Sequence, residues 1–165
     1  MRLPSKMVCL AAALLPLLSC APGERERTEA QVRPVSAAAP PYRFSPGSDQ
    51  TGKGAVVCAW WIYVGVQQTG EECFPGKDEA FKSELSRSIT RIDSFIIRNN
   101  STPVTQMQLD ASKQEQQQSN KQFDFCSGDG STMYKMMSSA GPMALRESVD
   151  ELLSIPREPV ADPCL

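Results

Sequence analysis

One apolar segment, Ala55 to Val66, limits the folds open to this chain more than any other feature. Beyond the first twenty residues it is the most hydrophobic stretch, and it reads Ala-Val-Val-Cys-Ala-Trp-Trp-Ile-Tyr-Val-Gly-Val. Its β-branched and aromatic residues favour a strand, but the chain offers no convincing second strand, and a lone strand would leave its backbone groups without hydrogen bonds. We therefore expect a buried helix; the alternative is an α+β fold with a short hairpin around 55–74.

A second helix is predicted over about 79–98. Pro75-Gly76 indicates a turn before it, and Asp78 is suited to cap its N-terminus. Apolar residues then recur every three to four positions, which is typical of a helix with one buried face. They are Phe81, Leu85, Ile89, Ile92, Phe95 and Ile96.

The next predicted helix, over about 105–125, is largely polar. Thr105 and Gln108 have the spacing of a capping box at its start. Its few apolar residues make its packing face thin, so we expect either a helix that is mostly exposed to solvent or a partly flexible segment.

Two shorter helices are expected near the C-terminus. Ser131 is suited to cap the first, over 133–139, and Gly141-Pro142 should end it and begin the second. Prolines after residue 155 then favour an extended tail. The predicted fold is mainly α: one small helical domain.

The N-terminus has the three parts of a secretory signal peptide. Arg2 and Lys6 supply the basic region, and Met7 to Leu18 is almost wholly apolar. This run would extend about 18 Å as a helix, too short for a hydrocarbon core of about 30 Å. We expect residues 1–19 to be a signal peptide that is removed after export.

The end of this segment, Leu17-Leu18-Ser19-Cys20, resembles the lipobox of bacterial lipoproteins. The resemblance implies that Cys20 becomes the new N-terminus and carries a diacylglyceryl group and, as is usual in that family, a third acyl chain such as palmitate. Two or more chains anchor a protein stably in a membrane. Because Ala21 rather than aspartate follows, the resemblance favours the outer membrane, facing the periplasm, over the inner membrane. The alternative is ordinary cleavage after Ala21.

Residues 20–54 have the composition of a linker. They are rich in proline and glycine and contain few large apolar side chains, so they should bury too little surface to offset the entropy of ordering. We expect a disordered, lipid-anchored tether here, followed by a folded domain over 55–165.

Four cysteines remain in the predicted domain: Cys58, Cys73, Cys126 and Cys164. In a small exported chain an even number indicates disulfides, and the spacings are far from the close pairs of structural zinc sites. If the helices over 79–98 and 105–125 run antiparallel, Cys73 and Cys126 lie together. Cys58 then pairs with Cys164 and holds the extended tail.

The composition removes several classes of function. The chain has no histidine, which excludes His-dependent catalytic triads, His-containing zinc sites and imidazole pH switches. Loss of the signal peptide leaves 15 of the 17 basic residues against 19 acidic ones, so nothing favours nucleic-acid binding. No cofactor or metal site is predicted, and the motifs of nucleotide-binding loops and serine hydrolases are missing.

These observations favour a non-catalytic envelope lipoprotein that acts through protein–protein contact, as inhibitors, immunity proteins and chaperones do. One alternative is a structural or assembly component of an envelope or secretion machine, and a less favoured one is a hydrolase that uses carboxylates. Candidate contact surfaces are the polar faces of the helices and any exposed part of Trp60, Trp61 or the methionine cluster Met133, Met136 and Met137. Trp60, Trp61 and Tyr63 are expected to belong to the core; the alternative is that they line a ligand cleft. No individual binding residue is assigned.

Overall fold

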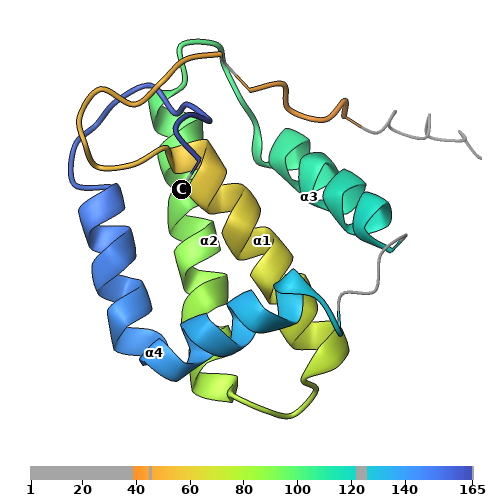
Figure 1. Cartoon of the computed structure of the whole chain (residues 1–165). Coiled ribbons are helices and arrows are strands. Elements are labelled where there is room, and N and C mark those ends of the chain that lie inside the picture. Colours follow the sequence, from red (N-terminus) through yellow and green to blue (C-terminus); the bar gives the residue numbers. More distant parts are fainter. Residues whose placement is uncertain (1–38, 45, 122–125, 165) are drawn as a thin grey trace, which may run out of the picture. The chain divides into compact units, whose positions relative to one another are not determined.

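The computed structural model describes residues 39–44, 46–121 and 126–164. These residues form four helices, α1 (Val56–Cys73), α2 (Glu79–Asn99), α3 (Gln106–Asn120) and α4 (Asp129–Leu152) (Figure 1). Among them no strand is found, and one isolated parallel bridge joins Ser48 to Asp162. The prediction of a mainly α domain braced by disulfides is confirmed. The predicted signal peptide, Cys20 and the predicted tether up to residue 38 lie outside the described residues.

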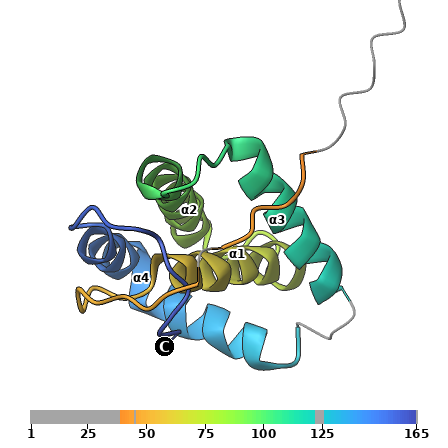
Figure 2. The same cartoon turned by 90° about the horizontal axis from the view of Figure 1, so that it is seen from above.

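α1 lies in the middle of the domain, with the other helices around it (Figure 2). Val57 and Val66, which point to opposite sides of the helix at about 100° per residue, are both buried, and so is Trp60. A helix that is apolar on every side is stable only when it is covered on every side. The hairpin alternative for residues 55–74 is therefore wrong.

The last turns of α1 pack against Tyr134 of α4, and Gly70 makes this possible. Tyr134 is fully buried, and its ring stacks on Phe74 with 4.5 Å between the centroids. A Cβ atom at Gly70 would lie 2.5 Å from Cε2 of Tyr134. Glycine at this position therefore leaves the space that the tyrosine ring occupies.

α2 has the predicted apolar stripe, with Phe81, Leu85 and Ile92 among its buried residues. The cap predicted for Asp78 is wrong. Asp78 has a φ of 53°, in the left-handed region, and its carboxylate accepts the hydroxyl hydrogen of Tyr134 at 3.2 Å. A buried tyrosine hydroxyl requires an acceptor, and Asp78 supplies it instead of capping the helix.

α3 begins with the predicted capping box. The Thr105 Oγ1 atom accepts the backbone N–H of Gln108 at 3.3 Å, and Gln108 Oε1 accepts the N–H of Thr105 at 2.9 Å. The helix is joined to α1 partly by polar contacts, such as Gln116 Nε2 donating to the carbonyl oxygen of Trp61 at 3.0 Å. The predicted continuation to residue 125 reaches residues 122–125, which are not described.

α4 consists of two helical arms that meet at Gly141. This glycine has a φ of 87° and a ψ of 171°, which is not helical, and Pro142 follows it. We call residues 129–140 the N-terminal arm and residues 142–152 the C-terminal arm. The two helices predicted here are thus found, but the first begins before Ser131. That serine is buried within the first turn, so its predicted role as a cap is wrong.

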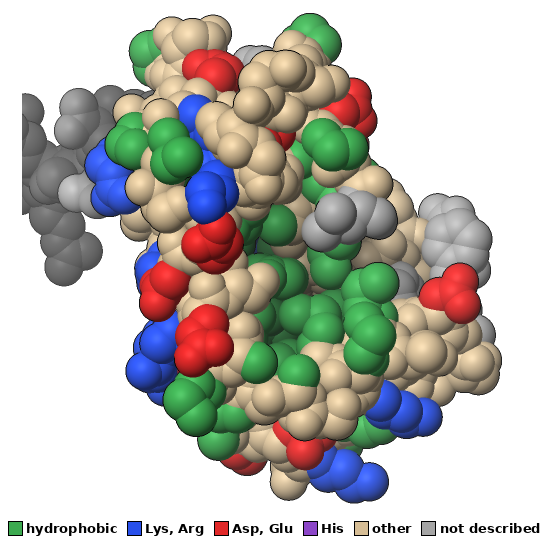
Figure 3. Space-filling view, turned by 60° about the vertical axis from the view of Figure 1, so that its left-hand side comes forward, with side chains coloured by type: hydrophobic (Ala, Val, Ile, Leu, Met, Phe, Trp, Pro, Cys, Tyr) green, Lys and Arg blue, Asp and Glu red, His purple; other side chains and the backbone are tan. Residues whose placement is uncertain are grey.

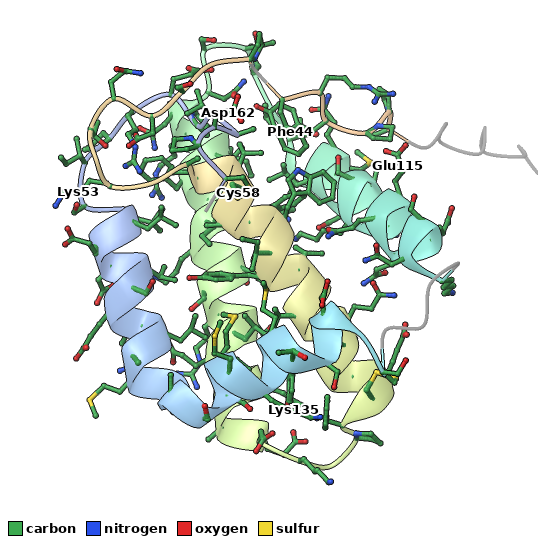
Figure 4. The ribbon with its side chains drawn as sticks, in the orientation of Figure 1. Phe44, Lys53, Cys58, Glu115, Lys135 and Asp162 are labelled. Carbon is green, nitrogen blue, oxygen red and sulfur yellow. A yellow bond between two sulfur atoms is a disulfide. The ribbon has the colours of Figure 1, made fainter. Side chains whose placement is uncertain are left out.

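The segment before α1 belongs to the folded domain, although residues up to 54 were predicted as a tether. Tyr42 is buried, and its N–H donates to Ser112 Oγ at 2.8 Å. Phe44 lies beside the start of α1 (Figure 4), with its ring 5.8 Å from that of Trp60. The domain therefore begins before residue 55, because aromatic side chains anchor a segment whose average composition is that of a linker.

The C-terminal tail completes the start of α1. The N–H of Val57, which has no acceptor within its own helix, donates to the carbonyl oxygen of Val160 at 3.0 Å. Arg157 binds the loop before α1 through Nε to Asp49 at 2.7 Å and through Nη2 to the carbonyl oxygen of Gly54 at 2.7 Å. The tail and the loop thus hold each other against the first turn.

Two disulfides, Cys58–Cys164 and Cys73–Cys126, each with 5.3 Å between their Cα atoms, join α1 to distant parts of the chain. These are the same pairs as the sequence favoured. Cys58 lies in the first turn of α1 and Cys73 is its last residue, so both ends of the central helix are cross-linked.

The two glycines of α1 provide a test of this packing. A Cβ at Gly65 would meet only Gln116 Nε2 at 3.5 Å, an ordinary contact. We expect Gly70→Ala to lower the free energy of unfolding by about 1–3 kcal/mol through overpacking. Gly65→Ala should leave it unchanged or raise it by up to about 1 kcal/mol, because alanine favours helices. Guanidinium unfolding of the oxidised proteins measures both, and equal stability of the two variants would contradict the close approach of Tyr134.

Candidate binding groove

An apolar pocket of about 460 Å³ opens between α1 and the two arms of α4. Figure 3 shows this hollow, with hydrophobic side chains on its floor. We call it the methionine groove. Its lining residues come from α1, the N-terminal arm, the C-terminal arm, the loop before α1 and the tail: Cys58, Ala59, Ile62 and Tyr63; Met133, Met136 and Met137; Ser148, Glu151 and Leu152; Lys53, Gly54 and Ala55; and Pro163.

The groove exists because α4 bends. Its two arms meet at an angle, and α1 lies across the corner (Figure 1). The bend requires the positive φ of Gly141, a conformation that glycine adopts without steric cost. A smaller hollow of about 160 Å³ shares Tyr63, Met137 and Ser148 with the groove and extends it to Ala140 beside the bend.

Methionines dominate the accessible apolar surface here. Met133 is 36% exposed and Met136 63% exposed, while Met137 packs partly buried against the core. Met143, on the C-terminal arm, is 70% exposed but does not line the groove. Because methionine is flexible and polarizable, such a surface adapts to apolar partners of different shapes.

One rim of the groove is charged. Lys53 lies on the loop before α1 (Figure 4), and it forms an ion pair with Glu151 of the C-terminal arm. The loop is fixed behind it by Arg157 and Asp49. Burial alone would raise the pKa of the Asp49 carboxyl, but hydrogen bonds from Thr51 and Arg157 and the charge of Arg157 outweigh it and lower that pKa. The ion pair between Arg157 and Asp49 therefore holds in place the loop that carries Lys53.

The C-terminal arm is held on α2 by the buried carboxylate of Glu84. Arg146 donates to it from Nε at 3.2 Å and from Nη2 at 2.8 Å. Arg87, on α2 itself, lies 3.3 Å from the same carboxylate. The hydrogen bonds from Arg146 are the main reason that the pKa of Glu84 lies below its ordinary value.

The candidate contact residues named from the sequence separate into two groups. Tyr63 and the methionines Met133, Met136 and Met137 line the groove. Trp60 does not, because it is fully buried and its Nε1 donates to Asp93 at 2.6 Å.

Trp61 packs partly buried against Phe44, with 5.2 Å between the ring centroids, and also lies outside the groove.

Sequence reasoning did not identify Ile62, Leu152 and Pro163 as lining residues of the groove. The Gly141-Pro142 pair was the available signal, because a bend there brings the second arm towards α1.

The described residues were searched for clusters of metal ligands and for helices that could span a membrane. They contain no group of three or more cysteine or acidic side chains placed to hold a metal ion. None of the helices they form is long and apolar enough to cross a membrane.

Comparison of the chain with family models, curated proteins and solved structures finds no significant match. The groove is therefore interpreted from its own chemistry.

The Glu84–Arg146 contact leads to a prediction about acid stability. Because the folded-state pKa of Glu84 is lowered, its contribution to stability is complete above the unfolded value near 4.5. That contribution is lost as the pH falls through the lower folded value. Arg146→Ala should therefore lower the thermal midpoint at pH 7. Below pH 4.5 the midpoint of this variant should decrease less with falling pH than the midpoint of the wild type does.

Arg87→Ala is the matched control, since this arginine is about as exposed as Arg146, 61% against 55%, but comes only within 3.3 Å of the same carboxylate. Its effect on the midpoint should be smaller at pH 7, and the effects of the two substitutions should converge as Glu84 becomes protonated. Thermal unfolding from pH 3 to pH 7 gives both profiles, and identical profiles for the two variants would contradict the dominant role of Arg146.

Proposed function

We propose that this chain is an exported lipoprotein, anchored through Cys20 to the cell envelope, whose helical domain acts without catalysis. In this proposal the methionine groove binds an apolar segment of a partner protein, as an inhibitor, immunity protein or chaperone does. The observation that carries the proposal is the accessible methionine surface at a preformed apolar groove. The signal peptide, the lipobox resemblance and the cysteine pattern support the location.

The groove suits a short amphipathic segment better than a polar ligand. Its walls offer aliphatic and thioether surface, with Lys53 and Glu151 at one rim. Each leucine or phenylalanine that a partner buries there contributes about 1.5–3 kcal/mol before the entropic cost of association. The rim charges contribute less to affinity, and they orient the bound segment.

The lipid anchor has a direct test. In a bacterial host given an alkyne analogue of palmitate, the wild-type chain should take up label and enter the membrane fraction. Cys20→Ser should abolish the label and leave an uncleaved precursor, because lipid-dependent cleavage requires the modified cysteine. Cys9→Ser is the matched control and should be labelled like wild type. A Cys20→Ser chain of normal mature size would instead indicate ordinary cleavage after Ala21.

The groove is tested by crosslinking in cells. A photo-crosslinking amino acid at position 136 should capture a defined envelope protein, and the same probe at position 143 should not. Both methionines are well exposed, but only Met136 lines the groove. A captured hydrolase would indicate an inhibitor or immunity protein, whereas a secretion or wall-assembly subunit would favour the assembly-component alternative. Equal adducts at the two positions would contradict the groove as the docking site.

A charge at the same position should remove binding without unfolding the domain. Met136→Asp places a carboxylate against an apolar partner surface, and its desolvation should weaken binding at least about tenfold. Met143→Asp should bind as wild type does. Affinity for the captured partner, measured by titration calorimetry, compares the two variants.

A further inference from the structure

Four of the seven methionines of this chain lie between residues 133 and 143. Three of them, Met133, Met136 and Met137, line the methionine groove. We propose that the thioether sulfurs of these three residues bind one Cu(I) ion. The proposal goes beyond partner docking and does not depend on it, because it concerns the sulfur atoms and not the apolar surface.

The spacing places these side chains on one side of one helical turn. Residues three and four apart on a helix are neighbours, with Cβ atoms about 5–6 Å apart, and Met133 stands in this relation to both Met136 and Met137. Methionine has three rotatable side-chain bonds, so three sulfurs in one turn are able to converge on one ion. The exposure of Met133 and Met136, 36% and 63%, leaves an ion a path from solvent.

The chemistry of the site selects a soft ion of low charge. Thioether sulfur is a soft, uncharged ligand that favours Cu(I), whereas Mg²⁺ and Ca²⁺ require oxygen ligands. The walls of the groove are mainly apolar, which disfavours a divalent ion without charged ligands. Glu151 places a carboxylate at the rim, where it lowers the cost of a single positive charge even while paired with Lys53.

The other common soft ligands are not offered by the domain. The chain contains no histidine, and the cysteines of the domain are joined in the disulfides Cys58–Cys164 and Cys73–Cys126. Thioethers also differ from thiolates, imidazoles and carboxylates in needing no deprotonation to bind a metal. Affinity for Cu(I) should therefore be the same at pH 5 and pH 7.5, which distinguishes this site from binding through ionisable groups.

Leucine substitutions separate the metal site from the docking surface. Leucine has nearly the volume and apolarity of methionine, so the exchange is well tolerated, but it removes the sulfur donor. Met136→Leu should lose Cu(I) affinity and keep the partner affinity of the groove. Failure of partner docking and failure of metal binding are thus distinguishable in the same variant.

The experiment uses the full chain, purified with its disulfides formed and its free thiols alkylated so that no thiolate competes. Anaerobic titration with Cu(I) against the chelator bicinchoninate gives affinity, and native mass spectrometry gives stoichiometry. We expect one ion per chain. Leucine at position 133, 136 or 137 should weaken binding at least about tenfold, the scale of disturbing a metal site. Met143→Leu, the matched control, should bind as wild type does.

X-ray absorption of the Cu(I)-loaded protein provides the structural readout, and a first shell of sulfur alone is expected. Wild-type affinity in Met136→Leu, or a shell dominated by nitrogen and oxygen, would overturn the proposal. Met137 is partly buried, so circular dichroism monitors folding of each variant. If Met137→Leu fails to fold, the well-exposed Met136 decides the question.

Discussion

The rest of the structure depends on the burial of α1. Its apolar residues face every direction around the helix axis, so no single neighbour is able to cover it. α2 and α4 cover two sides and α3 a third, while the loop before α1 and the C-terminal tail cover its first turn. The hydrogen bond from Val57 N–H to Val160 shows that this cover also satisfies the backbone at the start of the helix. The domain therefore needs its terminal segments as much as its helices, which is why it begins before residue 55.

The same requirement produces the groove. A straight α4 would cover α1 along one line only, whereas the bend at Gly141 lets one arm pass the end of α1 near Tyr134 and the other lie along α2. The hollow between the arms is lined by Met133, Met136 and Met137 on one side and by branched and aromatic side chains, Ile62, Tyr63 and Leu152, on the others, and it is left partly open. Packing thus accounts for the position of the hollow. It does not account for thioethers there, because leucine would pack equally well and favours a helix as strongly.

Much of the fold could be predicted because its signals are local. The stripe of α2, the capping box of Thr105 and Gln108 and the break at Gly141-Pro142 each depend on a few neighbouring residues. The helical state of α1 was predicted from an absence, because the sequence offers no second strand with which this segment could pair. The disulfide pairs were also predicted from the sequence, on the expectation that α3 would lie antiparallel beside α2. In the structure α3 also contacts α1, through the hydrogen bond of Gln116.

The contributions of Asp78, Ser131 and Tyr42 were missed because each depends on a distant partner or on burial that local patterns do not contain. For the same reason the methionines could be named from the sequence, but not the walls that face them. The groove arises only when the tail, the bent α4 and the first turn of α1 come together in space.

The two disulfides connect this architecture to the proposed location of the protein. Cys58–Cys164 draws the tail against α1 and places Pro163 in the wall of the groove, and Cys73–Cys126 fixes the other end of α1 close to the start of α4. Each closes a loop long enough to stabilise the fold by roughly 4 kcal/mol on the chain-entropy model. Disulfides persist outside the reducing cytosol, so the proposed export provides the conditions under which this cross-link adds to the hydrogen bonds that hold the tail at the groove. Oxidation of these four cysteines to disulfides removes their thiolates as metal ligands and leaves the methionine thioethers as the soft sulfur ligands of the domain. The proposed export to an oxidising compartment therefore favours the proposed Cu(I) site.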